Sequence, residues 1–214
     1  MRLRNITGAD EVIEKSKYVI KEPQKWKGLW KSVFEKNAPI YIEVGMGKGR
    51  FIMEMALQNP DINFIGIEKY SSVLLRAVQK VEEMDISNLK LIQMDATEIE
   101  TVFKNEEVDK IYLNFSDPWP KDRHAKRRLP SRQFLDRFRN ILKNQGDIEF
   151  KTDNKCLFDF AVEEVEPAGW YIEKITYNLH NDKKMMIGNV MTEYEEKFSA
   201  KGNPIYKYII KRKD

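Results

Sequence analysis

Five acidic residues stand where short apolar segments of this 214-residue chain end, and each of these segments is expected to be a strand. The residues are Glu43, Glu68, Asp95, Asp117 and Asp153. If the strands are parallel, their carboxyl ends meet at one edge of a sheet, where sheets of this kind bind ligands. A row of carboxylates at that edge favours a ligand that carries positive charge.

A glycine-rich loop follows the first of these segments. Gly45, Gly47 and Gly49 let the backbone turn sharply and come close to a ligand, although such a triplet alone is also typical of a simple tight turn. The dinucleotide fingerprint G-x-G-x-x-G would need glycine at position 50, where Arg50 stands. Glu43 would repel a pyrophosphate but suits a positively charged amino-acid group.

The next two acids, Glu68 and Asp95, could bind the other parts of such a ligand. Glu68 lies 23 residues after Gly45, near the spacing at which an acid binds ribose hydroxyls. Asp95 ends the third strand and could accept a hydrogen bond from the exocyclic amine of an adenine. An adenosine that bears a cationic amino-acid arm is S-adenosylmethionine (SAM), so these residues predict SAM as the bound cofactor.

A basic segment directly follows Asp117. Residues 121–132 hold six lysines and arginines and one aspartate, a net charge of +5, whereas the whole chain carries only +3. Such a run is often just a solvated loop, but its place beside the predicted site favours binding of nucleic-acid phosphates. Within the same loop, Trp119 could stack on a base or fill the core beneath the loop.

The hydrophobic pattern predicts an α/β fold. Apolar runs predict strands over 40–44, 63–67, 89–94, 108–115 and 147–151, and amphipathic or capped segments predict helices over 50–58, 71–84, 131–143 and 155–166. Strands that alternate with helices form a parallel sheet covered on both faces. Two late strands, 170–177 and 205–211, have no helical crossover between them and should form an antiparallel pair at one edge. Asn144, Gln145 and Gly146 are expected to end the third helix.

Residues 1–36 differ from the rest of the chain. They hold nine lysines and arginines, five acids and three isolated large apolar residues, Trp26, Trp30 and Phe34. We expect a partly mobile basic arm that ends in a short helix, followed by a single domain over 37–214.

Composition limits the protein class. Hydrophobic residues make up 42% and charged residues 33%, which is typical of a soluble globular protein, and no apolar run is long enough to span a bilayer. A single cysteine, Cys156, excludes an internal disulfide and is assigned to the core, and two histidines exclude a histidine-rich metal site. We expect a cytoplasmic protein without a metal, a membrane contact or an obligatory protein partner.

The segment Asp117-Pro118-Trp119-Pro120-Lys121 and the basic residues after it resemble the hallmark of bacterial tRNA (guanine-N7)-methyltransferases, the TrmB family. The resemblance extends over residues 40 to about 198. Further matching segments are 43–49, 67–68, 95–96, 151–153 and 192–195.

This resemblance implies a Rossmann-like class I SAM-dependent methyltransferase with a mostly parallel seven-stranded sheet. It implies methylation of guanine 46 in the variable loop of tRNA. The implied cofactor-binding residues are Glu43, Gly45, Gly47, Gly49, Glu68, Asp95, Ala96 and Asp117. The implied substrate-binding residues are Lys121, Asp153, Thr192, Tyr194 and Glu195, and the implied RNA-binding residues are Arg123, His124, Lys126, Arg127 and Arg128.

The residues also suit this chemistry. N7 of guanine has an in-plane lone pair, so no proton must leave before it attacks a methyl group. Asp117 is expected to orient the guanine and to stabilise the positive charge that develops on it. Local explanations stay open for two positions: Asp153 could cap the following helix, and Thr192 with Glu195 could form a capping box.

Three other functions are alternatives to tRNA methylation. A SAM-dependent methyltransferase that acts on a different RNA or on a non-RNA substrate stays open, and the six basic residues beside the site argue only against a small neutral substrate. An oxidoreductase that binds NAD is disfavoured by Arg50 and Glu43. A non-catalytic RNA-binding module would not need acids at five strand ends, since they repel phosphate.

Overall fold

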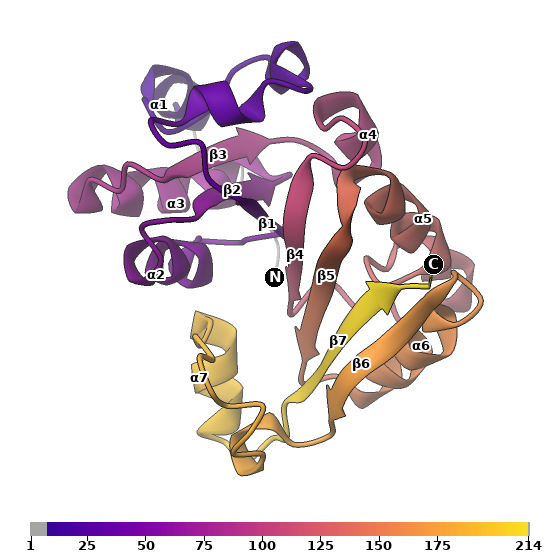
Figure 1. Cartoon of the computed structure of the whole chain (residues 1–214). Coiled ribbons are helices and arrows are strands. Elements are labelled where there is room, and N and C mark those ends of the chain that lie inside the picture. The colour runs from indigo at the N-terminus through magenta and orange to yellow at the C-terminus, as the bar shows by residue number, and fades with distance from the viewer. Residues whose placement is uncertain (1–7, 214) are drawn as a thin grey trace.

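The computed structural model describes residues 8–213, in which seven strands form one sheet (Figure 1). The strands are β1 (Ile40–Val44), β2 (Asn63–Glu68), β3 (Leu89–Gln93), β4 (Val108–Asn114), β5 (Leu142–Thr152), β6 (Trp170–Thr176) and β7 (Tyr206–Arg212). Their spatial order is β3-β2-β1-β4-β5-β7-β6.

Strands β1 to β5 are parallel, and β7 is antiparallel to both β5 and β6. The predicted mostly parallel sheet with an antiparallel pair at one edge is therefore confirmed. Strand β7, the last in the chain, lies inside the sheet. Strand β6 forms the edge, and about half of its residues are exposed. Strand order reverses between β1 and β4, which is where doubly wound sheets bind ligands.

Helices cover both faces of the sheet. The α-helices are α1 (Ala9–Lys15), α2 (Arg50–Gln58), α3 (Ser71–Met84), α4 (Ile99–Val102), α5 (Arg132–Ile141), α6 (Lys155–Val165) and α7 (Glu193–Ser199). Short 3-10 helices are η1 (Pro23–Trp26), η2 (Trp30–Val33), η3 (Ala96–Glu98), η4 (Asp122–Arg127) and η5 (Leu179–Asn181).

Alternation along each strand assigns its side chains to one face or the other. In β1, Ile40, Ile42 and Val44 pack with α5 and α6, whereas Tyr41 faces the core around α2 and α3. Glu43 has the same parity as Tyr41. Its carboxylate therefore lies on the α2 side of the sheet, under the glycine loop.

The described part of the predicted arm packs against the domain. Trp30 is fully buried, and its indole Nε1 donates a hydrogen bond to the Val102 carbonyl (2.9 Å). Helix α1 lies on α3, and Val19 forms a parallel bridge with Leu91 of β3. The predicted terminal helix is the single turn η2. The division of the chain at residue 37 stays a prediction.

Two local predictions are wrong. Residues 144–146 do not end a helix, because α5 stops at Ile141 and β5 begins at once. Gly146 is instead needed for close packing: a Cβ there would lie 2.7 Å from the Asp109 carbonyl oxygen of the neighbouring chain segment. Cys156 is exposed rather than buried. In the first turn of α6, the side chains that face the core are those of Leu157 and Phe158.

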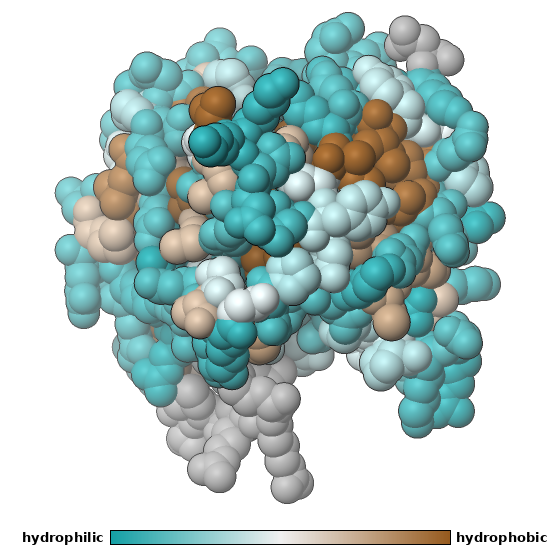
Figure 2. All heavy atoms as spheres, turned by 90° about the horizontal axis from the view of Figure 1, so that it is seen from below, coloured by the Kyte–Doolittle hydropathy of each residue, from teal (hydrophilic) through white to brown (hydrophobic). Residues whose placement is uncertain are grey.

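None of the helices between residues 8 and 213 combines the length and the apolar character needed to cross a bilayer. Figure 2 views the molecule from below Figure 1, at the edge where β4 and β5 end, and shows a face that is mostly hydrophilic.

Candidate active site at the carboxyl edge of the sheet

The loop between β1 and α2 has the backbone shape that its glycines predict. Gly45, Gly47 and Gly49 have φ angles of +77°, +60° and +77°, a region that residues with side chains rarely adopt. Gly49 is the N-cap of α2. The loop therefore crosses the end of β1 as a tight, glycine-dependent turn.

Glu43 is buried beneath this loop, with 1% of its surface exposed. One carboxylate oxygen, Oε1, accepts a hydrogen bond from Asn114 Nδ2 (2.8 Å), and the other, Oε2, has no partner. Burial raises the pKa of Glu43 to about 8, against the opposing effects of Asn114 and Lys151. An unpaired buried carboxylate oxygen is costly unless a ligand satisfies it, and a cationic amine is the natural partner.

Glu68 lies within electrostatic reach of both Glu43 and Asp117. The Glu68 carboxylate accepts hydrogen bonds from the backbone N–H groups of Gly47 (3.1 Å) and Tyr70 (2.9 Å). Burial raises the pKa of Glu68, and the charge of Asp117 adds to this rise. Glu68 in turn adds to the raised pKa of Glu43. The structure thus brings the acids of β1, β2 and β4 to one place.

Asp95 is held at the end of β3 by its own partners. Its carboxylate accepts hydrogen bonds from Lys69 Nζ (2.6 Å) and from the backbone N and side-chain hydroxyl of Thr97 (2.9 and 2.8 Å). Burial alone would raise the pKa of Asp95, but these bonds outweigh it and lower the pKa to about 2. Asp95 caps η3, which begins at the half-buried Ala96.

The loop after β4 presents Asp117 at the surface in a constrained backbone. Asp117 is exposed, and the flanking Phe115 and Trp119 both have positive φ angles, 50° and 40°. Non-glycine residues in this region are strained and cluster at functional sites. The half-buried Trp119 contacts His124 edge-on (5.6 Å) and lies under the Arg127 guanidinium (5.1 Å). Trp119 is therefore not part of the core, and its ring is partly covered by His124 and Arg127.

Arg128 holds this loop in place. Its guanidinium donates hydrogen bonds to the carbonyls of Pro118 (3.1 Å) and Trp119 (3.1 Å), and it lies over the Phe160 ring (4.4 Å). Only 10% of its side chain is exposed. In this structure its guanidinium thus supports the Asp117 loop, and its contact with RNA phosphates stays a prediction.

We expect Arg128→Gln to destabilise the protein by about 1–3 kcal/mol, because two backbone carbonyls lose a charged donor. Thermal unfolding measures this loss. Arg123→Gln is the matched control, since Arg123 is exposed in the same segment and should leave unfolding unchanged. Equal unfolding temperatures for the two variants would contradict the assignment of Arg128.

The remaining basic residues face solvent. Arg123, Lys126 and Arg127 are exposed and His124 is half-buried, all in the short helix η4. Lys121, which precedes η4, is also exposed. Arg127 and His124 contact Trp119, and the binding of phosphates by this segment stays a prediction.

Asp153 lies half-buried at the end of β5, and the possibility that it caps α6 is wrong. The cap is Asn154, whose side chain accepts a hydrogen bond from the Leu157 backbone N (2.9 Å). Asp153 does not cap α6, and it lies at the carboxyl edge of the sheet, as Asp117 does.

The segment 192–195 forms half of a capping box. Thr192 Oγ1 accepts a hydrogen bond from the Glu195 backbone N (2.9 Å), but the Glu195 side chain turns inward and binds Lys151 (2.7 Å). Tyr194 is 54% exposed, and its ring packs against Phe198 and lies 5.9 Å from Phe115, two residues before Asp117.

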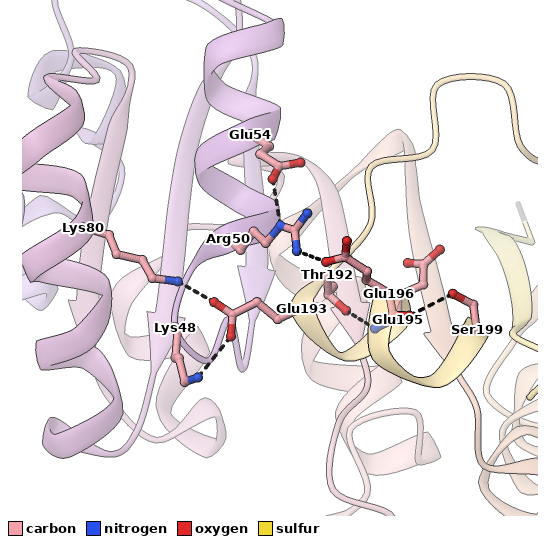
Figure 3. Close-up of polar contacts among 9 residues, drawn as sticks. All are labelled: Lys48, Arg50, Glu54, Lys80, Thr192, Glu193, Glu195, Glu196 and Ser199. Atoms are coloured by element: carbon pink, nitrogen blue, oxygen red, sulfur yellow. Dashed lines mark hydrogen bonds and ion pairs between the residues drawn. The ribbon is translucent and has the colours of Figure 1, made fainter. Parts of the chain in front are cut away.

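Ion pairs tie α7 to the glycine loop (Figure 3). Glu193 lies between Lys48 (3.0 Å) and Lys80 (2.5 Å), and Arg50 binds both Glu54 and Glu196. The pairs that Glu193 and Glu196 form could not be predicted from the sequence, because their members are more than 110 residues apart and charge alone does not choose among possible partners.

Two cavities border the segment that leads into α7. One, of about 270 Å³, is lined by Tyr112, Glu149, Lys207 and neighbours; the other, of about 320 Å³, is lined by Lys48, Arg76, Lys80, Glu193 and neighbours. Neither is lined by Glu43, Glu68 or Asp117, so we place the candidate site by the converging acids instead. Over residues 8–213, no group of three His, Cys, Asp or Glu side chains is arranged to hold a metal ion.

Comparison with known proteins assigns the family. A family described as "Putative methyltransferase" matches residues 37–208. A tRNA (guanine-N(7)-)-methyltransferase of Lachnoclostridium phytofermentans is 54% identical over 209 residues, which cover 98% of this chain and 97% of that protein. The chain belongs to the tRNA (guanine-N7)-methyltransferase family.

Other relatives agree with this family. The protein of the same name from Bacillus subtilis is 48% identical, with 97% of each chain covered. Among solved structures, a 16S rRNA methyltransferase, KamB, aligns with a TM-score of 0.62 at 11% identity, covering 82% of this chain and 88% of that one. At such low identity this likeness shows the fold alone, and it confirms the predicted Rossmann-like class I methyltransferase fold.

Proposed function

We propose that this protein transfers the methyl group of SAM to N7 of guanine 46 in the variable loop of tRNA, in the cytoplasm. The observation that carries the proposal is the buried, unpaired oxygen of Glu43 under a glycine loop, in a chain whose relatives are named for tRNA guanine-N7 methylation. The proposal needs a cation seated at Glu43 and an RNA base beside Asp117.

The residues present fit SAM. Glu43 would accept a hydrogen bond from the amino group, the glycine loop would admit the chain of the ligand, and Glu68 would bind the ribose hydroxyls in place of its bond to Gly47. Asp95 and Ala96 would border the adenine. When bound, SAM supplies a methyl group attached to a positively charged sulfur.

The reaction needs placement more than proton transfer. The lone pair of guanine N7 forms the new N–C bond, the C–S bond breaks, and the sulfur keeps its electron pair, so positive charge passes to the purine. The exposed carboxylate of Asp117 would orient the guanine edge and stabilise this charge. Lys121, Asp153, Thr192 and Tyr194 would hold the base, and Tyr194 already lies beside Phe115 in the loop that carries Asp117.

The exposed cations of η4 would bind the RNA backbone. We expect the triple variant Arg123→Gln, Lys126→Gln, Arg127→Gln to bind tRNA more weakly and to lower the slope of log affinity against log salt by about 2–3. Filter binding at several salt concentrations measures both effects. Lys143→Gln, Lys211→Gln, Lys213→Gln is the matched control, since these lysines lie where β5 begins and β7 ends, at the opposite edge. An equal change of slope in the control would count against this surface.

The function itself is tested by incubating the protein with methyl-labelled SAM and bulk tRNA. The proposal expects label in 7-methylguanosine after digestion, mapped to position 46. Label in another nucleoside or at another position would show a methyltransferase with a different target, the alternative that the sequence left open. No label in RNA would overturn the proposed function.

A further inference from the structure

Lys151 is a fully buried charge at the edge where the candidate site lies. Its side chain has 0% exposure, at the carboxyl end of β5 and two residues before Asp153. Burying an ammonium group is costly unless hydrogen bonds and an opposite charge compensate for it. The reaction described above gives this lysine no task.

The groups that accept hydrogen bonds from the Lys151 side chain belong to one distant segment. Its Nζ donates hydrogen bonds to Glu195 Oε2 (2.7 Å), Asn189 Oδ1 (3.1 Å) and the Val190 carbonyl (2.9 Å). All three partners belong to residues 189–195, which lead into α7. One side chain of β5 therefore fastens this segment to the sheet.

Glu195 completes the network. It is also 0% exposed, and its second oxygen, Oε1, accepts a hydrogen bond from Asn189 Nδ2 (2.8 Å) and lies 3.2 Å from His180 Nε2. Both carboxylate oxygens are thus occupied inside the protein. Of the residues expected to bind substrate in 192–195, Glu195 is the one whose side chain points inward.

The network fixes residues that do face the site. Thr192 and Tyr194 shortly precede Glu195 in sequence, and the exposed Tyr194 ring lies beside Phe115, in the loop that carries Asp117. The outer ion pairs of α7 in Figure 3 are largely exposed, with 39–56% exposure for Glu193, Lys48 and Glu196, and such pairs contribute little. The buried pair is the stronger anchor.

We propose that Lys151, through Glu195 and Asn189, is a positioning residue that holds segment 189–195 across the carboxyl edge so that Thr192 and Tyr194 meet the purine opposite Asp117. This rests on the proposed function. It gives Glu195 an indirect part in the reaction, in place of a direct contact with the substrate.

The test compares Lys151→Met with Lys207→Met. Lys207 is a matched control, because it also forms a buried ion pair on the same face of the sheet, with Glu149 (2.6 Å), and its Cα pairs with that of Lys151 across β5 and β7. At saturating SAM and tRNA, we expect Lys151→Met to lower kcat about 10- to 100-fold, as for a misplaced substrate contact, and Lys207→Met to change it less than 3-fold. Amide exchange over 189–199 should speed up at least 10-fold in Lys151→Met alone.

A double variant separates anchoring from stability. Lys151→Met with Glu195→Gln leaves no unpaired buried charge, so its thermal unfolding should return toward that of the wild type. The positioning role expects kcat to stay at least 10-fold low. Recovery of kcat to within 3-fold of the wild type, or an equal loss in Lys207→Met, would overturn the proposal. If the wild type itself forms no 7-methylguanosine, the proposed function fails instead, and amide exchange still decides whether Lys151 anchors the segment.

Discussion

Asp117→Asn should lower kcat by about 100-fold or more with little change in folding stability. The substitution keeps the shape of the side chain and removes the negative charge that would face the purine as it becomes positive, and such preorganised charges commonly contribute a factor of this size. Asp117 is exposed and sits in a loop fixed by Arg128, so the fold does not depend on its charge. Single-turnover methylation at saturating SAM and tRNA measures the effect.

Asp122→Asn is the control for this variant. Asp122 is fully exposed, begins η4 five residues further along the chain, and lies 3.7 Å from the Arg128 guanidinium. We expect near wild-type turnover from it. If Asp117→Asn also turns over at the wild-type rate, the orienting and electrostatic role of Asp117 is wrong.

Glu43→Gln should weaken SAM binding while it stabilises the free protein. Loss of the carboxylate removes the charged partner of the amino group, and hydrogen bonds to charged groups are worth about 1.5–3 kcal/mol, or roughly 10- to 100-fold in affinity. Glutamine can still accept the hydrogen bond from Asn114, so the fold keeps this contact. Calorimetric titration with SAM measures the affinity.

The stability effect of Glu43→Gln depends on pH. Burial raises the pKa of Glu43 to about 8, above its value near 4.5 in the unfolded chain. Below about pH 4.5 both states hold the proton, and the stability linked to this group is fully present. As pH rises toward 8, the unfolded chain loses the proton and the folded protein keeps it, so the wild type loses stability. The variant has no such loss.

Thermal unfolding at pH 5 and at pH 8 therefore tests the environment of Glu43. We expect the unfolding temperature of Glu43→Gln to exceed that of the wild type at pH 8, by an amount on the order of 5 °C, and the gap to shrink at pH 5. Glu83→Gln, on the exposed side of α3, is the control and should show no growing gap. A gap that is equal at both pH values would show that Glu43 does not carry the raised pKa.

Under the proposed function, these two variants test a methyl-donor half and a methyl-acceptor half of the site. Glu43 lies under the glycine loop, and Asp117 lies above the end of β4, yet Glu68 is close enough for its pKa to depend on Asp117 and for its charge to affect Glu43. A sulfonium placed between these carboxylates would be stabilised before transfer, and the purine after it. Donor binding should therefore respond to Glu43 and turnover to Asp117.

Local sequence determined the framework of the site. Gly45, Gly47 and Gly49 were expected to let the backbone turn sharply, and all three have positive φ angles, which glycine adopts at low cost. The acids at the ends of β1, β2 and β4 were expected to converge, since parallel strands end at one edge. Both inferences depend on neighbours in sequence and on the period of a strand, and both hold in the structure.

Only the tertiary structure decided which polar groups are partners. Asn114 binds Glu43 across 71 residues, Lys151 binds Glu195 across 44, and Arg128 donates to the Trp119 carbonyl. A side chain's charge and its place in a motif leave many such partners open. Burial selects among them, because a charge removed from water must be compensated where the fold has placed it.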